Sequence, residues 1–493
     1  MEDARHPGFL RGSPAFGPWS FYKDALAIVV PVMLQLLITS LISLIDNFMV
    51  AGLGDVKMAA VNVANQINFV YIVIVNATCM AGGIFLSQHR GAKDEEGMRQ
   101  SLRFKLMAAL AFAVLHSALC LLCPEALIRI MLGGNREGED IVREGARFLR
   151  LVTPSFAPIA VTSAISSSYR DVGRTRVPLL ISSAAAALCT LLNWLLIYGM
   201  LGAPRLEVAG AAAATDIARL VEAAVFLVSL STARPAFAFP PRSFFRIDAG
   251  LFKRIRSRSA MMLFSETAWV LSETVITAIY NGRGGAETVA GMAAGWTIAN
   301  IFFTVFWAVI TATSVIIGST LGSDRLDEAR QKGRWILYGS FIFGLCVGAV
   351  AASSTFLIPL VFGNLSPQAR AVTRGLVFVI SAYVPLWTLL NAQFALSRAG
   401  GDTAMGVWVD VGVTYVVFIP LAFALAAWTG FGPVLLFGLA KLSDFGKAAV
   451  AFWWLAKEKW VKNLAEKPEG AADADSSRAH GPASDGQSRS SGA

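Results

Sequence analysis

Four carboxylates interrupt the long apolar stretches of this sequence: Asp46, Glu266, Glu273 and Asp410. A carboxylate inside a membrane-spanning helix costs about 2.5 kcal/mol or more on insertion scales, so it normally faces a water-filled cavity or a partner. In a poorly solvated cavity a carboxylate can exchange a proton or hold a dehydrated cation. We therefore expect these four residues to serve in ion coupling or substrate binding.

Three of these residues also have a structural interpretation. Asp46 stands shortly before the turn at Gly54-Asp55, which is equally consistent with a helix-end aspartate at the level of the lipid headgroups. Glu273 could make a polar contact near the outer surface, and Asp410 could be a structural hydrogen-bond partner. The residue types alone leave both interpretations open.

Polar and aromatic residues accompany the carboxylates. Trp269 lies one turn from Glu266, and an indole face next to a carboxylate suits an organic cation. Core packing or lipid contact is the alternative for Trp269. The other candidates for a substrate cavity are amides within the predicted helices: Asn47, Asn193, Asn391 and Gln393.

The composition is that of a membrane protein. Of the 493 residues 55% are hydrophobic and only 15% are charged, whereas soluble domains carry about 25% charge. The apolar segments are each near the ~20 residues that span a bilayer. They cover 24–50, 58–86, 101–123, 142–167, 176–200, 207–232, 251–280, 286–318, 330–360, 371–396, 404–428 and 431–456. We therefore predict an all-α polytopic membrane protein with about twelve transmembrane helices.

Basic residues predict the orientation. They concentrate in alternate loops on the side of the N-terminus, for example around Arg90 and between 233 and 258. The positive-inside rule then places both termini in the cytoplasm and the helices in the plasma (inner) membrane. The net charge of +9 is explained in this way without a nucleic-acid partner. We interpret the 233–250 stretch as a solvated loop with a helix that lies on the membrane surface, and contact with anionic membrane lipids is the alternative.

The sequence gives little sign of an enzyme or of a bound cofactor. Its five cysteines lie in apolar runs, and its four histidines form no ligand spacing. No Walker loop, HExxH or GxSxG motif is present, which argues against catalysis and against direct use of ATP. We expect no cofactor and no metal other than a coupling ion.

The two halves of the chain resemble each other. Gly91 and Arg99 recur as Gly322 and Arg330, and SSYRDVGRT near residue 170 recurs as ALSRAGGDT near residue 398. Parallel repeats of six helices place a substrate cavity between two lobes. The predicted organisation is a cytoplasmic tail (1–20), a first lobe (21–232), a linker (233–250), a second lobe (251–463) and a disordered tail (464–493).

The order of several short motifs resembles the multidrug and toxic compound extrusion (MATE) transporters. They are P31-x14-D46-N-F-M-V-A-G-L-G, N193-W-L-L-I-Y-G199, G210-A-A-A-A-T215, F264-S-E266-T-A-W269 and R398-A-G-G-D402-T403. The resemblance covers roughly residues 24 to 463. It implies twelve helices in two pseudo-symmetric lobes of six around a central cavity, and export of organic, often cationic, compounds by antiport with Na⁺ or H⁺.

The resemblance also implies roles for individual residues. The ion-linked carboxylates of the family's first and seventh helices fall on Asp46 and Glu266, where Na⁺ would bind if it is the coupling ion. Some sodium-coupled members carry an aspartate in the tenth helix, but the amides Asn391 and Gln393 stand in that region here. Proton-coupled members often have an aspartate four residues after the position of Asn193, where this chain has Ile197. The coupling ion stays open.

The main alternative function within the same fold is a lipid-linked saccharide flippase. A flippase holds an anionic pyrophosphate and needs arginine or lysine in its cavity. The predicted charges within the membrane are mainly acidic and the basic residues fall in loops, which favours export of cations. We also expect Asp216 and Asp444 to form i,i+3 ion pairs with Arg219 and Lys447, and the protein to act as a monomer.

Overall fold

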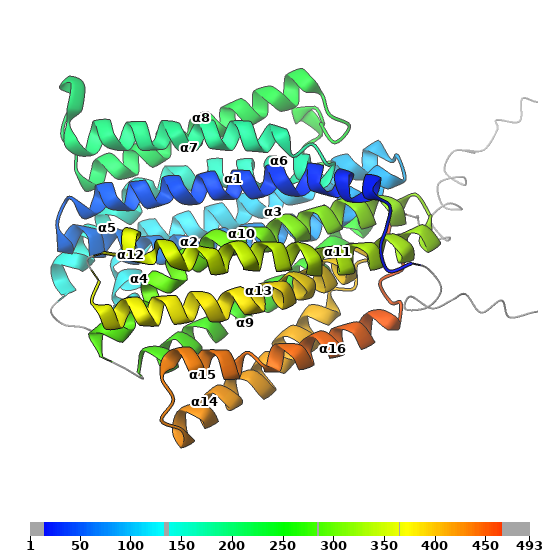
Figure 1. Cartoon of the computed structure of the whole chain (residues 1–493). Helices are drawn as coiled ribbons and strands as arrows, with labels where there is room; N and C mark the ends of the chain where they lie inside the picture. Colours follow the sequence, from blue (N-terminus) through cyan, green and yellow to red (C-terminus); the bar gives the residue numbers. More distant parts are fainter. Residues whose placement is uncertain (1–13, 133–137, 283–284, 364, 466–493) are drawn as a thin grey trace, which may run out of the picture.

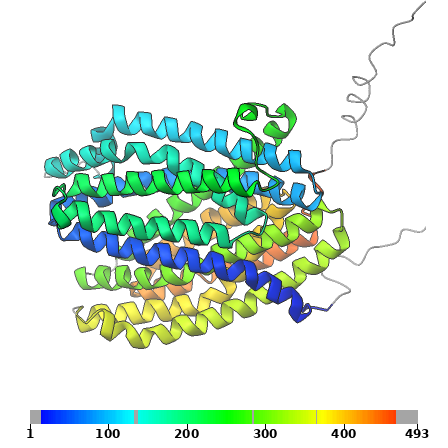
Figure 2. The ribbon, with the colours of Figure 1, turned by 90° about the horizontal axis from the view of Figure 1, so that it is seen from above.

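The computed structural model describes residues 14–132, 138–282, 285–363 and 365–465. Its long helices run side by side along one direction, as Figures 1 and 2 show from two sides. Both described chain ends lie at the same end of this bundle, which we call the terminal end (Figure 1). Most of the two predicted tails and the side chain of Asn47 fall outside the described part.

The described secondary structure is helical throughout, so the all-α prediction is confirmed for this part of the chain. The first half contains α1(Trp19–Ala51), α2(Asp55–Gly91), α3(Glu95–Leu122), α4(Pro124–Met131), α5(Glu139–Val152), α6(Phe156–Asp171), α7(Arg176–Tyr198) and α8(Val208–Ala233). The second half contains α9(Ala249–Asn281), α10(Ala286–Gly322), α11(Leu326–Ser353), α12(Ile358–Val361), α13(Pro367–Ala399), α14(Ile419–Trp428), α15(Pro433–Ala440) and α16(Ser443–Ala456).

Nine helical stretches among the described residues are long and apolar enough to cross a membrane. The other three predicted segments fall short for visible reasons. α8 carries Asp216, Arg219 and Glu222, and α9 carries Glu266 and Glu273 among its apolar residues. The last segment is broken between α15 and α16 by the turn at 441–442.

Two predicted helices are not continuous α-helices. A 3₁₀ turn at Thr153–Ser155, which contains Pro154, separates α5 from α6, because proline removes a helical hydrogen bond. Ahead of α14 the chain forms two π-helical turns, Gly406–Val411 and Thr414–Phe418. Asp410 therefore lies on a π-turn, a feature often found at functional sites.

Helix lengths repeat between the two halves. α1 and α9 both have 33 residues, α2 and α10 both have 37, and α3 and α11 both have 28. The second member of each pair begins 230 or 231 residues after the first. The two halves are therefore near copies in backbone as well as in their short motifs.

The two halves meet where α2 and α10 approach the terminal end. A Cβ added to Gly322 would lie 1.8 Å from the carbonyl oxygen of Gln88, and one added to Gly91 would lie 2.0 Å from that of Ser319. Gly91 corresponds to Gly322, and Gln88 to Ser319, so the two contacts are copies of each other, as in a twofold interface. Glycine is needed at both places because the two backbones touch.

The C-terminal segment Lys457–Ala465 covers this contact. The Gln88 side chain donates hydrogen bonds to the carbonyls of Ala399 (2.7 Å) and Lys462 (3.3 Å) and accepts one from the Leu464 N–H (2.5 Å). Trp460 is fully buried, and its carbonyl packs against Gly400. The terminal end is thus closed by backbone contact between the halves and by a segment that bridges them.

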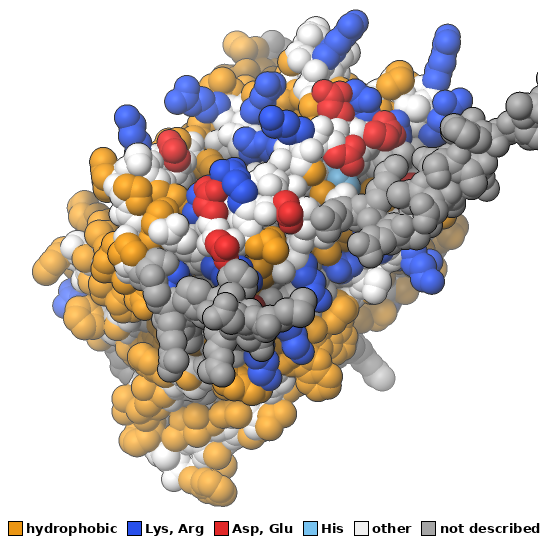
Figure 3. All heavy atoms as spheres, turned by 90° about the vertical axis from the view of Figure 1, so that its right-hand side faces the viewer, with side chains coloured by type: hydrophobic (Ala, Val, Ile, Leu, Met, Phe, Trp, Pro, Cys, Tyr) orange, Lys and Arg blue, Asp and Glu red, His pale blue; other side chains and the backbone are white. Residues whose placement is uncertain are grey.

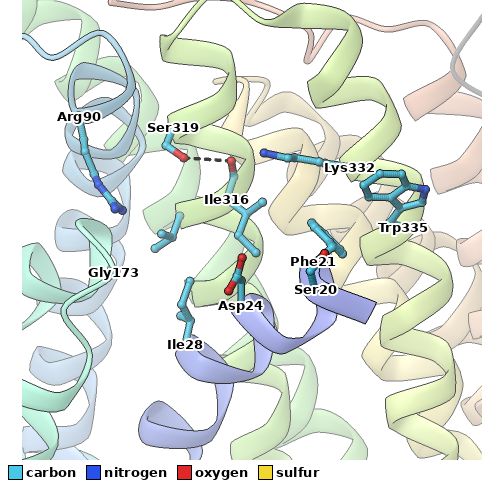
Figure 4. Close-up of a pocket in the computed structure, with 11 residues that line it drawn as sticks. Ser20, Phe21, Asp24, Ile28, Arg90, Gly173, Ile316, Ser319, Lys332 and Trp335 are labelled. Carbon is cyan, nitrogen blue, oxygen red and sulfur yellow. Dashed lines mark hydrogen bonds between the residues drawn. The ribbon is translucent and has the colours of Figure 1, made fainter. Parts of the chain in front are cut away.

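Basic side chains gather on the surface of the terminal end (Figure 3). A crevice of about 390 Å³ lies there between α1, α10 and α11, with Asp24, Arg90 and Lys332 on its walls (Figure 4). The ammonium of Lys332 pairs with Glu328 at 2.8 Å. The crevice is part of the terminal-end surface and separate from the larger cavity described next.

Candidate substrate cavity

A cavity of about 600 Å³ lies between the two halves of the chain. Residues of α1, α2, α6, α7 and α8 line it from the first half, and residues of α9, α10 and α13 line it from the second. The tight contact between α2 and α10 lies toward the terminal end of the bundle. The cavity is therefore bounded on that side by the meeting of the two halves.

Two of the predicted carboxylates face this cavity from opposite halves. Asp46 on α1 accepts a hydrogen bond from the Thr190 hydroxyl of α7 at 2.8 Å. Glu266 on α9 lies 3.6 Å from the guanidinium of Arg398. Asp46 stands near the end of α1 opposite the terminal end, yet its side chain lines the cavity, which agrees with the functional interpretation.

Aromatic side chains form part of the wall. Trp269 lines the cavity one turn from Glu266 and is 46% exposed, so its ring is available to a ligand. Trp307 and Phe69, which were not predicted from the sequence, line it as well and are similarly exposed. A ring face close to a carboxylate can bind an organic cation. Such a ligand would be attracted both by the cation–π interaction with the ring and by the charge of the carboxylate.

Arginines also line the cavity, which corrects the expectation that the basic residues fall in loops. They are Arg170, Arg219 and Arg398. α6 and α13 continue to Asp171 and Ala399, beyond their predicted ends, so Arg170 and Arg398 stand on last turns of helices. Helical side chains lean toward the N-terminus, which here points them back toward the cavity.

One of the two predicted i,i+3 ion pairs is wrong. Arg219 pairs with Glu222 at 2.8 Å rather than with Asp216. Glu222 is the better partner because it is a buried carboxylate on the cavity side of α8. In the second half the predicted pair is confirmed, since Lys447 lies 3.7 Å from Asp444.

Comparison with known proteins assigns the family. A family model described as MatE matches residues 31–198 and 262–424, more than half of the chain. The chain belongs to the MatE family. Its members are transporters and not enzymes. The resemblance drawn from the short motifs is thereby confirmed.

Individual relatives are distant but match over most of their length. The chain is similar to the "Probable multidrug resistance protein NorM" of Thermotoga maritima, with 22% identity over 425 residues, 83% of this chain and 87% of the relative. A protein of the same name from Geobacillus kaustophilus is 26% identical over 369 residues, 71% of this chain and 78% of the relative.

Solved structures confirm the fold class. The crystal structure of MATE in complex with MaL6 superposes with a TM-score of 0.79 at 19% identity, over 92% of this chain and 97% of that chain. The predicted architecture of about twelve membrane helices in two pseudo-symmetric lobes around a central cavity is therefore correct. We use "first lobe" for α1–α8 and "second lobe" for α9–α16.

The other two predicted carboxylates of this MATE chain lie outside the residues that line the cavity. Asp410 pairs with Lys447 at 2.9 Å, and Glu273 lies 4.0 Å from Lys441. Lys447 also donates to the Thr414 hydroxyl at 3.0 Å. These groups form a separate polar cluster within the second lobe, where lysines already compensate the acids.

Three of the four predicted amides lie within the helix packing, away from the cavity lining. Asn193 is buried on α7, and the amide of Asn391 donates to the Trp387 carbonyl of its own helix at 2.9 Å. Gln393 is fully buried and donates to the Ala448 carbonyl at 3.3 Å, which joins α13 to α16. None of these three is among the described residues that line the cavity. The side chain of Asn47 lies outside the described part.

Proposed function

We propose that this chain is a secondary-active exporter of organic, cationic drugs or metabolites. It would work by antiport with Na⁺ or H⁺, through alternating access between the two lobes. The observation that carries this proposal is one cavity that receives Asp46 from one lobe and Glu266 from the other. The names of the relatives as multidrug resistance proteins support the same substrate class.

Competition for a carboxylate gives antiport a simple physical basis. A coupling ion and an organic cation each neutralise the same acid, so one leaves when the other binds. Asp46 suits the coupling ion better than Glu266, because its described partner is the uncharged hydroxyl of Thr190. Glu266 stands beside Arg398, which repels a small cation.

Alternating access needs a contact that can open. The reciprocal Gly91 and Gly322 contacts close the terminal end in the state described, and the basic surface there is typical of a cytoplasmic face. We propose that this face is cytoplasmic and that it opens by rocking of the two lobes. Both termini would then lie on the cytoplasmic side of the inner membrane.

The three cavity arginines weaken one argument against a flippase, but they do not reverse it. The acids Asp46, Asp171, Glu222 and Glu266 outnumber the arginines among the described lining residues. Two of the three arginines also have a carboxylate within 4 Å. Asp171 is itself paired with Lys105, so these groups nearly cancel and a pyrophosphate would meet no net positive charge in the cavity.

Dye efflux tests the proposal. Cells that express wild type, Asp46→Asn, Glu266→Gln or the exposed control Glu287→Gln are loaded with a cationic dye, and Na⁺ and pH are varied separately. We expect both cavity variants to lose gradient-driven export by about tenfold or more, the scale of one charged interaction, while the control exports normally. The gradient that wild type requires names the coupling ion. Normal export by both variants contradicts the assignment of the two carboxylates.

A further inference from the structure

Arg170 is a cavity arginine without a carboxylate of its own. Its guanidinium donates to the Ser166 hydroxyl one turn earlier on α6 at 3.3 Å. No carboxylate among the described residues lies within 4 Å of the Arg170 guanidinium, the distance of an ion pair. Arg219 and Arg398 each have such a carboxylate. A half-buried guanidinium inside a membrane protein is costly unless something compensates it.

The neighbouring acid is already taken. Asp171 is paired with Lys105, whose ammonium is fully buried and also donates to the hydroxyls of Ser167 and Ser168 at 3.2 Å. Near the C-terminal end of α6, two positive groups, Lys105 and Arg170, thus lie close to a single carboxylate, Asp171. This corner of the cavity keeps one positive charge in excess.

The other lobe shows what is missing. Arg398 corresponds to Arg170 in the repeat, and its guanidinium faces Glu266. Helix α9 starts 230 residues after α1, so the position that corresponds to Glu266 is Leu36. Its neighbour Gln35 is uncharged too, and lines the cavity with a buried carbonyl oxygen that has no hydrogen-bond partner within the described chain. The first lobe has kept the arginine and lacks the acid.

Hydroxyl groups line the cavity along the helix that carries Arg170. Ser166 is in contact with the guanidinium, and Ser163 and Thr162 follow along α6, about two turns from Arg170. A guanidinium can donate two parallel hydrogen bonds to the two oxygens of a carboxylate, and an adjacent hydroxyl can donate a further one. Elsewhere in the cavity the carboxylates Asp46, Glu222 and Glu266 outnumber the arginines Arg219 and Arg398 by one. A molecule that carries only negative charge is therefore disfavoured, and one that carries both signs is matched at both ends.

We propose that Arg170 and the α6 hydroxyls form an anion subsite that binds the carboxylate of zwitterionic organic substrates, whose cationic part lies against Asp46 or Glu266. The inference rests on the proposed export function and narrows its substrate class. Zwitterions with a separated carboxylate are expected to bind more tightly than their esters.

A matched dye pair tests the subsite. Rhodamine 110 carries a free carboxylate, and rhodamine 123 is its methyl ester with the same cationic ring system. Binding of both dyes to purified protein in nanodiscs is measured by fluorescence anisotropy for wild type, Arg170→Gln, Arg170→Lys and the exposed control Arg174→Gln. We expect Arg170→Gln to weaken rhodamine 110 about tenfold and to leave rhodamine 123 nearly unchanged. Arg170→Lys should recover most of the loss, and Arg174→Gln should change neither dye.

Several results would overturn the inference. One is an equal loss of both dyes in Arg170→Gln, which indicates a structural role. Another is wild-type protein that does not bind rhodamine 110, or that binds it no more tightly than the ester. If Arg170→Gln does not fold, Arg170→Lys decides, because lysine keeps the charge but lacks the planar fork: a small loss of affinity confined to rhodamine 110 supports the subsite, and an equal loss of both dyes overturns it. Failure of wild type to export rhodamine 123 in cells would instead count against the proposed export function, so the two failures are distinct.

Discussion

The two lobes are alike in backbone and different in charge. Where they meet, Gly91 and Gly322 make the same contact, and their helices have equal lengths. Inside the cavity the equivalent arginines differ, since Arg398 faces Glu266 and Arg170 has no carboxylate partner among the described residues. The second lobe also holds a compensated lysine–carboxylate cluster around Lys447.

This difference separates two tasks. At the terminal end the same glycine contact is made twice, once from each lobe. In the cavity the equivalent positions of the two lobes carry different charges, as the proposed recognition of a substrate requires. Substitutions at symmetrical positions that carry the same residue should therefore have equal effects in both lobes, and substitutions in the cavity should not.

The largest expected effect is at the glycine contact. Gly322→Ala and Gly91→Ala each place a methyl group within 2.0 Å of a carbonyl oxygen of the other lobe, so each should abolish closure of the terminal end. We expect export to fall about a hundredfold in both variants, with a longer spin-label distance between Ala92 and Arg325. Gly446→Ala is the control, since nothing lies within 4 Å of its added methyl group. A variant that exports normally would contradict the symmetrical contact.

The next effect concerns the cluster of the second lobe. Lys447→Met leaves Asp410 and Asp444 without their shared cation, and removal of one partner from a buried pair costs about 3 kcal/mol. Unfolding by SDS titration in mixed micelles measures the loss. Arg143→Met in the first lobe removes an exposed pair of the same i,i+3 spacing with Asp140, and should cost less than about 0.5 kcal/mol. Equal losses would show that burial does not decide the difference.

A double-mutant cycle sharpens the comparison within the cavity. Glu266→Gln and Arg398→Gln each leave one charge of the 3.6 Å pair unmatched, so the double variant should be more stable than the sum of the two predicts, by about 1 kcal/mol. The same SDS titration provides the numbers. The matching cycle of Gln35→Ala with Arg170→Gln should be additive, and coupling there would argue against an unpartnered Arg170.

The smallest effect is expected at the C-terminal bridge. Gln88→Ala removes three hydrogen bonds to the second half of the chain, and we expect a loss of about 1 kcal/mol because water replaces part of them. Ser319 corresponds to Gln88, but its hydroxyl bonds only to Ile316 of its own helix among the described groups. Ser319→Ala should therefore be neutral, and hydrogen exchange of the Leu464 amide should rise only in Gln88→Ala.

Much of the fold could be predicted from the sequence. Apolar runs of bilayer length and repeated short motifs are local signals, which is why the helices and the two-lobe repeat were recovered. Asp46 and Glu266 could be placed at the cavity for a related reason, since a carboxylate is expensive in an apolar run wherever it stands, and Trp269 followed from its position one turn from Glu266. The breaks at Thr153–Ser155 and at 441–442 were missed, because apolar composition does not distinguish a continuous helix from an interrupted one.

The sequence did not show which group neutralises each charged side chain within the membrane. Asp410 and Glu273 look like Asp46 in sequence, yet lysines far along the chain or on another helix compensate them. Arg170 and Arg398 look like loop residues, yet their helices extend far enough to bring them into the cavity. The sequence by itself determined which residues are costly in a membrane. Only the tertiary structure decided which of them are neutralised, because ion pairs depend on distances between helices that no local pattern encodes.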